Sequence, residues 1–108
     1  MERLPKSVYN LVVATVADYD RMKILIEKNQ ISREQTATFV RKISAIDNAL
    51  VAVCDGERSD VRDALRLDIA QKRGYERGFA RSYYTSEPTY VRRKQDAILL
   101  IAKMLELI

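Results

Sequence analysis

The residues best suited to chemistry in this chain are basic, and they gather in one stretch. From Lys72 to Lys94 there are seven Lys and Arg residues and two Glu residues, whereas the whole chain has a net charge of +4. Guanidinium and ammonium groups bind phosphate oxygens, and Arg can also donate two parallel hydrogen bonds to the edge of a guanine. A charged helix face is by itself more often a solvated surface, so a nucleic-acid interpretation depends on the elements that carry these residues.

Those elements predict a helix-turn-helix between residues 74 and 108. A short helix is expected over residues 75–84. Ser86 and Pro88 then predict the start of the last helix, because Ser caps a helix N-terminus well and Pro fits the first turn. Two helices joined by so short a turn, the second opening with a basic first turn, can place that second helix in the major groove of DNA.

The predicted DNA contacts lie on both of these helices. On an ideal helix that begins after Ser86, Thr89 and Arg92 point away from the apolar face and Arg93 lies at its border, so these three are expected to face the groove. Arginines at a spacing of four on the preceding helix are expected to contact the phosphate backbone. The predicted DNA-binding residues are Arg73, Arg77, Arg81, Ser86, Thr89, Arg92, Arg93 and Lys94.

Two groups of residues in this region allow a second interpretation. Lys94 falls on the apolar face of the last helix, where its ammonium group either snorkels to the surface or reaches a phosphate; snorkelling is preferred. Tyrosines of this region stack on bases if the ligand is single-stranded, but tyrosines beside a helix pair more often fill the edge of a core. Core positions are therefore expected for Tyr75, Tyr83, Tyr84 and Tyr90.

Apolar residues at helical spacing predict three further helices, over about residues 5–28, 32–54 and 59–74. Ser32 is the expected N-cap of the second, and Gly74 the expected end of the third. With three Gly and two Pro in the chain, the predicted fold class is all-α with about five helices. A single domain, 1–108, would combine an N-terminal helical hairpin (1–55) with a trihelical DNA-binding part (59–108). The residues expected to face inward include Leu11, Val40, Phe79, Tyr83, Val91 and Ile108.

Several function classes find no support in the sequence. The chain has no His, no Gly-rich phosphate loop and no paired carboxylates, and Cys54 has no partner for a disulfide or a metal site. We therefore predict no catalytic activity, no metal and no cofactor. The apolar run 8–17 is too short to span a bilayer, and Asp18 and Asp20 do not suit a signal peptide, so a cytoplasmic location without membrane contact is expected.

The run from Tyr75 to Lys94 resembles a known family. A capping Ser86, the pair Thr89-Tyr90, and then Arg92 resemble the C-terminal helix-turn-helix of the phage-type RinA/ArpU transcriptional regulators, which is similar to region 4 of sigma-70 factors. The resemblance implies sequence-specific binding of double-stranded DNA, a role in transcription regulation and contact with RNA polymerase. One departure is that the helix before the turn is often acidic and apolar in the family but is basic here.

A helical adaptor is the alternative prediction from a different class of protein. Its arginines would recognise an acidic protein surface instead of phosphate. The apolar residues Ile98, Ile101, Leu105 and Ile108 keep a spacing at which the last helix can pair with its own copy, so a homodimer is compatible with both predictions.

Overall fold

The computed structural model describes residues 4–84 and 86–108, and these residues form helices and no strand. The predicted all-α class is confirmed, with five α-helices. Residues 1–3 of the predicted hairpin and Thr85 of the predicted turn lie outside the described residues. The α-helices are α1 (Lys6–Ala17), α2 (Tyr19–Lys28), α3 (Arg33–Val53), α4 (Ser59–Ala70) and α5 (Glu87–Met104).

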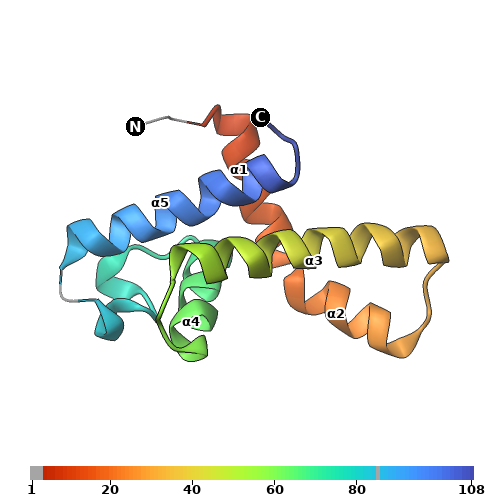
Figure 1. Ribbon diagram of the computed structural model, residues 1–108, viewed down its shortest axis with the longest axis horizontal. Coiled ribbons are helices and arrows are strands. Elements are labelled where there is room, and N and C mark those ends of the chain that lie inside the picture. The colour runs from red at the N-terminus through yellow and green to blue at the C-terminus, as the bar shows by residue number, and fades with distance from the viewer. Residues whose placement is uncertain (1–3, 85) are drawn as a thin grey trace.

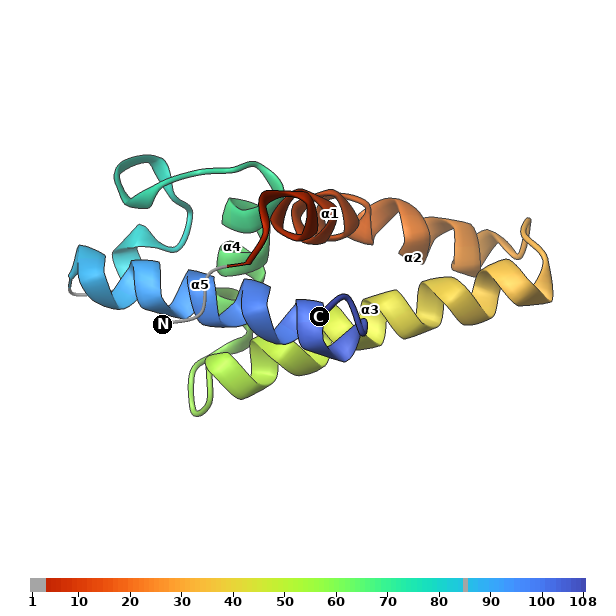
Figure 2. The same cartoon turned by 90° about the horizontal axis from the view of Figure 1, so that it is seen from above.

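The longest helix, α3, lies along the long axis of the molecule, and the other helices are arranged around it (Figure 1). α5 runs antiparallel beside the C-terminal half of α3, and α4 packs near that same half. α1 crosses this group steeply and contacts α4 and α5 (Figure 2). α2 turns back along the N-terminal half of α3, so these two helices form a hairpin at one end, while the segment between α4 and α5 lies toward the other.

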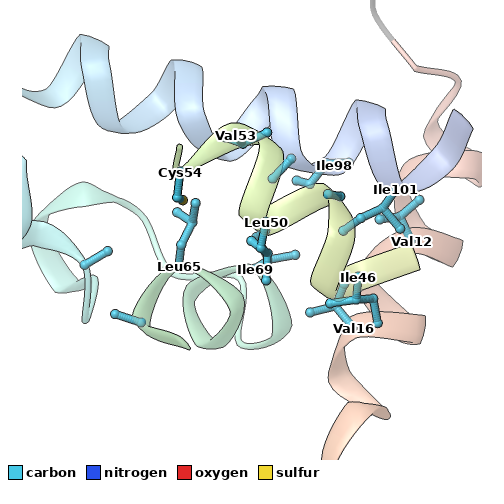
Figure 3. Packing of buried hydrophobic residues seen from close by; sticks show 14 of the residues in the cluster. Val12, Val16, Ile46, Leu50, Val53, Cys54, Leu65, Ile69, Ile98 and Ile101 are labelled. Atoms are coloured by element: carbon cyan, nitrogen blue, oxygen red, sulfur yellow. The ribbon is translucent and has the colours of Figure 1, made fainter. Parts of the chain in front are cut away.

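One cluster of buried apolar side chains joins the helices. Val12 and Val16 of α1 lie beside Ile46 of α3 and Ile101 of α5, and all four are almost completely buried (Figure 3). Leu65 of α4 extends the same cluster toward the other end of α3. Residues from both predicted parts, 1–55 and 59–108, therefore contribute to a common core.

The helix predicted over residues 5–28 is interrupted at Asp18, where α1 ends and α2 begins. The Asp18 carboxylate accepts two hydrogen bonds from the Arg21 guanidinium, at 2.5 and 2.6 Å, and these bonds lower the pKa of the carboxyl group. One turn earlier, the Thr15 hydroxyl donates to the Leu11 carbonyl. Local hydrogen bonds of short polar side chains bend helices. The prediction of one uninterrupted helix is therefore wrong.

The helix predicted over residues 59–74 ends earlier, at Ala70. Lys72 adopts a left-handed conformation with φ of 55°, a role that glycine more often fills. Its N–H donates to the Ile69 carbonyl, and the N–H of Arg73 donates to the Asp68 carbonyl. These two bonds are the usual pair that closes a helix C-terminus. Gly74 is therefore not the residue that ends α4.

The largest difference from the sequence-based expectation lies in residues 75–84, which do not form an α-helix. They contain two short 3-10 turns, η1 (Tyr75–Arg77) and η2 (Arg81–Tyr83). The predicted first helix of a helix-turn-helix is therefore wrong. By contrast, Ser32 and Ser86 cap α3 and α5 as predicted, each accepting a hydrogen bond from the backbone N–H three residues on.

Some residues expected to face inward are exposed. Residues 79 and 83 lie in the 3-10 segment, where helical spacing does not apply, and Ile108 lies beyond the end of α5. The other three lie on helix faces that the core does not cover. Their exposed fractions run from 37% for Val91 to 53% for Ile108. The exposed residues of this group are Leu11, Val40, Phe79, Tyr83, Val91 and Ile108.

Two leucines provide a matched test of this core. Leu50 is 3% exposed and Leu11 is 50% exposed. We expect Leu50→Ala to lower the free energy of unfolding by about 2–5 kcal/mol, because it removes buried methyl groups and leaves a cavity. Leu11→Ala should cost less than about 1 kcal/mol. Urea denaturation followed by circular dichroism measures both, and equal losses would contradict the assignment of the core.

Candidate nucleic-acid interface

The segment between α4 and α5 is held by a buried carboxylate, that of Asp68 on α4. Asp68 is 0% exposed. Its Oδ1 accepts the N–H of Phe79 at 2.6 Å, and its Oδ2 accepts the N–H of Ala80 at 3.0 Å and the hydroxyl of Tyr90 at 3.0 Å. Buried backbone N–H groups need acceptors. Asp68 provides here the acceptors that carbonyl groups would provide in an α-helix, and it ties the segment to both α4 and α5.

Gly78 allows the segment to approach this carboxylate closely. A Cβ atom at position 78 would lie 2.7 Å from Oδ2 of Asp68, 2.9 Å from the hydroxyl oxygen of Tyr90 and 3.0 Å from the carbonyl oxygen of Gly74. These separations are shorter than side-chain carbons tolerate. The absence of a side chain at residue 78 is therefore a condition for the contact with Asp68.

Lys94 lies beside Asp68 and its hydrogen-bond donors, and not on an open surface. Its ammonium group donates a hydrogen bond to the carbonyl oxygen of Arg73, and the side chain is partly buried. Burial lowers the pKa of Lys94, while the negative charge of Asp68 acts in the opposite direction. The cation thus lies near the buried carboxylate and fixes the chain just after α4.

Polar side chains around the Glu57 carboxylate connect the end of this segment to the turn after α3. The hydroxyl of Tyr84 donates to the Glu57 carboxylate at 3.1 Å, and the Arg93 guanidinium lies 3.9 Å from the same carboxylate. Arg93 also donates to the carbonyl oxygen of Val53 at 3.0 Å. The thiol of Cys54 lies 3.9 Å from the Tyr84 hydroxyl, and burial raises its pKa. Arg93 therefore connects α5 to the end of α3.

The tyrosines of this region divide between core and surface. Tyr90 is buried and packs edge-on against Tyr75 and Tyr84, with ring centroids 5.4 and 6.0 Å away. Tyr84 is also buried, and Tyr75 is partly buried against the core. The predicted core positions of these three are confirmed. Tyr83 is exposed instead, and its hydroxyl donates to Asp60 at 3.2 Å.

The predicted DNA-binding cations differ in what their side chains contact. Arg73 donates to the side chain of Gln71 and to the carbonyl oxygen of Arg77, while exposed Arg81 forms an ion pair with Glu76 at 3.3 Å. Arg77 and Arg92 are exposed, and their side chains have no hydrogen bond or ion pair with the described residues. Ser86 and Thr89 are partly buried and bond to each other at the start of α5.

A hollow with charged walls lies between the end of α4 and the start of α5. Its volume is about 560 Å³. Lys72, Arg73 and Arg77 bring positive charge to its wall, and Glu76 and Glu87 bring negative charge. The hollow places the left-handed turn after α4 and the first turn of α5 on one surface.

Sequence reasoning missed Asp68 and Gly78, the residues that shape this region. A signal for Asp68 was present, because it follows Ala64 and Leu65 by four and three residues and so shares the apolar face of its helix. An acid on such a face requires hydrogen-bond donors. Nothing in the local sequence indicated that these donors would be backbone N–H groups of the next segment.

This chain matches no family model, no curated protein and no solved structure in the comparisons made. Within residues 4–84 and 86–108, no helix is long and apolar enough to cross a membrane. The same residues contain no group of three or more Cys, Asp or Glu side chains placed to hold a metal ion. The resemblance to RinA/ArpU regulators stays a prediction.

Two glycines test the close contact at Asp68. We expect Gly78→Ala to lower the free energy of unfolding by about 1–3 kcal/mol, because the added methyl group displaces Asp68 or Tyr90. Gly74→Ala is the matched control, since a Cβ there meets nothing within 4 Å. It should change stability by less than about 1 kcal/mol. Chemical denaturation measures both, and an unaffected Gly78→Ala protein would show that the segment does not bind Asp68 in this way.

The buried phenols predict a loss of stability at high pH. Burial raises the pKa of Tyr84 and of Tyr90 above the ordinary value. The unfolded chain therefore loses these protons near pH ~10 while the folded chain keeps them. The free energy of unfolding should then fall above that pH, by at most about 1.4 kcal/mol per pH unit for each tyrosine. Tyr84→Phe should reduce this slope in denaturation series between about pH 10 and 12; an unchanged slope would contradict the role of Tyr84.

Proposed function

We propose that this chain binds double-stranded DNA through α5 and the segment before it, residues 72–94. The observation that carries the proposal is the state of Arg77 and Arg92. Both guanidinium groups are exposed and have no side-chain partner among the described residues. They belong to the stretch 72–94, in which basic residues outnumber acidic ones by seven to two. Exposed cations without an internal partner are available to neutralise phosphate.

The arrangement of the elements supports a single surface. The N-terminal half of α5 and the segment after α4 lie toward the same end of the molecule, away from the hairpin of α2 and α3 (Figures 1 and 2). The hollow between them joins Lys72 and Arg77 to the first turn of α5. The dipole of α5 adds partial positive charge at that turn, while the Glu87 carboxylate opposes it. A curved duplex backbone can contact such a surface at more than one phosphate.

The proposal gives the basic residues different roles. Arg92 lies on the exposed side of α5, and Asp96 follows it by four residues, about one helical turn. The Asp96 carboxylate repels phosphate, which disfavours a phosphate contact for Arg92. Arg92 is therefore assigned to base edges in the groove, and Lys72, Arg77 and Arg81 to the phosphate backbone. Arg73, Arg93 and Lys94 bind main-chain carbonyl groups of the protein and are assigned to positioning the surface.

The role in transcription regulation and the contact with RNA polymerase rest only on the resemblance of residues 75–94 to the RinA/ArpU regulators. DNA binding does not need the predicted helix-turn-helix. The 3-10 segment packs against α4 and α5 through Asp68, so α5 is still presented on a fixed support. The alternative partner for the free guanidinium groups is an acidic protein, and the binding experiment below distinguishes it from duplex DNA.

Fluorescence anisotropy with labelled random-sequence and selected duplexes tests the proposal, with salt varied between about 50 and 200 mM. We expect Arg77→Ala to weaken binding to all duplexes and to reduce the slope of log K against log salt concentration by about 0.9. Arg92→Ala should reduce discrimination between duplexes by about 1–3 kcal/mol. Both variants should stay folded, because these side chains make no internal hydrogen bond among the described residues.

Arg33→Ala is the matched control. Arg33 is also exposed, but it begins α3 at the tip of the hairpin, away from the proposed surface. Its removal should leave affinity and salt dependence nearly unchanged. Weak wild-type binding without preference among duplexes, or equal losses for all three variants, would refute the proposed surface and favour a helical adaptor with an acidic protein partner.

A further inference from the structure

The segment between α4 and α5 displays an exposed aromatic ring, that of Phe79. The ring is 46% exposed and lies between Arg77 and Arg81 in the sequence Arg-Gly-Phe-Ala-Arg. Covering an exposed phenylalanine ring with the apolar part of a ligand is favourable in water. The ring is therefore available to contact a ligand, in addition to the basic residues of the proposed DNA surface.

The backbone that carries this ring is fixed from the buried side. The N–H of Phe79 donates to Oδ1 of Asp68 at 2.6 Å, and the next N–H, that of Ala80, donates to Oδ2 at 3.0 Å. Gly78 before it has no space for a Cβ atom. The main chain is thus held against α4 while the ring points outward. Binding of a ligand to the ring therefore costs little conformational entropy in this segment.

Arg73 orients the ring further. Its guanidinium carbon lies 4.4 Å from the centroid of Phe79, within the range of a cation–π interaction. The same guanidinium donates to the side chain of Gln71 at 2.9 Å and to the carbonyl oxygen of Arg77 at 2.9 Å. The hydrogen-bonded guanidinium of Arg73 therefore covers one face of the ring, and the exposed part of the ring has a fixed orientation.

We propose that Phe79 is a specificity residue that contacts the 5-methyl group of thymine in the major groove; this inference rests on the proposed binding of duplex DNA. A phenylalanine ring has no hydrogen-bond donor or acceptor. Among the base edges of the major groove, the feature that it complements is the thymine methyl group, which is apolar. Arg77 and Arg81, on either side in the sequence, supply charge for the neighbouring phosphates.

Two duplexes that differ only in this methyl group test the inference. One is an alternating adenine–thymine duplex, and the other has uracil in place of every thymine. We expect the wild-type protein to bind the thymine duplex about fourfold more tightly for each methyl group contacted, the effect of burying one such group. Phe79→Ala should bind both duplexes with the same affinity, and its salt dependence should equal that of the wild type, because no charge is lost.

Val91→Ala and Arg92→Ala are the controls. Val91 is the exposed apolar residue of α5 in the same region, and its variant should keep the preference for thymine. Arg92→Ala should keep the ratio of the two affinities, because Arg92 is not assigned to the methyl group. Circular dichroism and thermal melting verify that each variant is folded.

Each other outcome overturns the inference. Wild-type protein that binds both duplexes equally, Phe79→Ala protein that keeps the preference, or loss of the preference in Val91→Ala instead would show that Phe79 does not contact thymine. In these cases the proposed DNA binding still stands. Wild-type protein that binds neither duplex overturns the inference, and binding to random-sequence duplexes then decides separately whether the proposed function stands.

Discussion

The carboxylate of Asp68 is buried at the end of α4, and the shape of the candidate interface depends on it. A buried carboxylate is costly unless donors surround it. Here two backbone N–H groups and the Tyr90 hydroxyl provide them, and the Lys94 ammonium lies close enough to act on it electrostatically. The donors come from the segment after α4 and from α5. Satisfying this single group therefore fixes α4, the 3-10 segment and α5 relative to one another.

This constraint explains why an otherwise helix-compatible segment is not an α-helix. In an α-helix the N–H groups of Phe79 and Ala80 would donate to carbonyl groups four residues earlier. In this protein they donate to a side chain on another helix, and Gly78 makes that approach possible. Leaving a buried donor or acceptor unpaired costs about 1–3 kcal/mol, more for a charged group. The three contacts with Asp68 together therefore outweigh the modest helix propensity of a short segment.

The cations of this region fall into two groups. Arg73, Arg93 and Lys94 bind main-chain carbonyl groups. Arg93 and Lys94 connect α5 to the end of α3 and to the chain after α4, while Arg73 braces the segment between α4 and α5. Arg77 and Arg92 remain at the surface without such partners among the described residues. The proposed function depends on the second group, and the first group holds the second in place. A count of basic residues does not reveal this division, because it depends on which carbonyl groups the fold brings near.

Features that depend on neighbours along the chain could be predicted from the sequence. Ser32 and Ser86 cap their helices through the N–H three residues on, and helical periodicity identified α3 and α5 as well as the all-α class. The basic stretch was also visible, because charge is a property of composition. The 3-10 segment and the division of the cations depend on tertiary contacts, whereas the break at Asp18 involves hydrogen bonds between residues three and four positions apart, which helical periodicity did not reveal. The physical reason for the dependence on tertiary contacts is that the hydrogen bonds at Asp68, and those from Arg93 and Lys94 to main-chain carbonyl groups, join residues more than ten positions apart, so no local pattern specifies them.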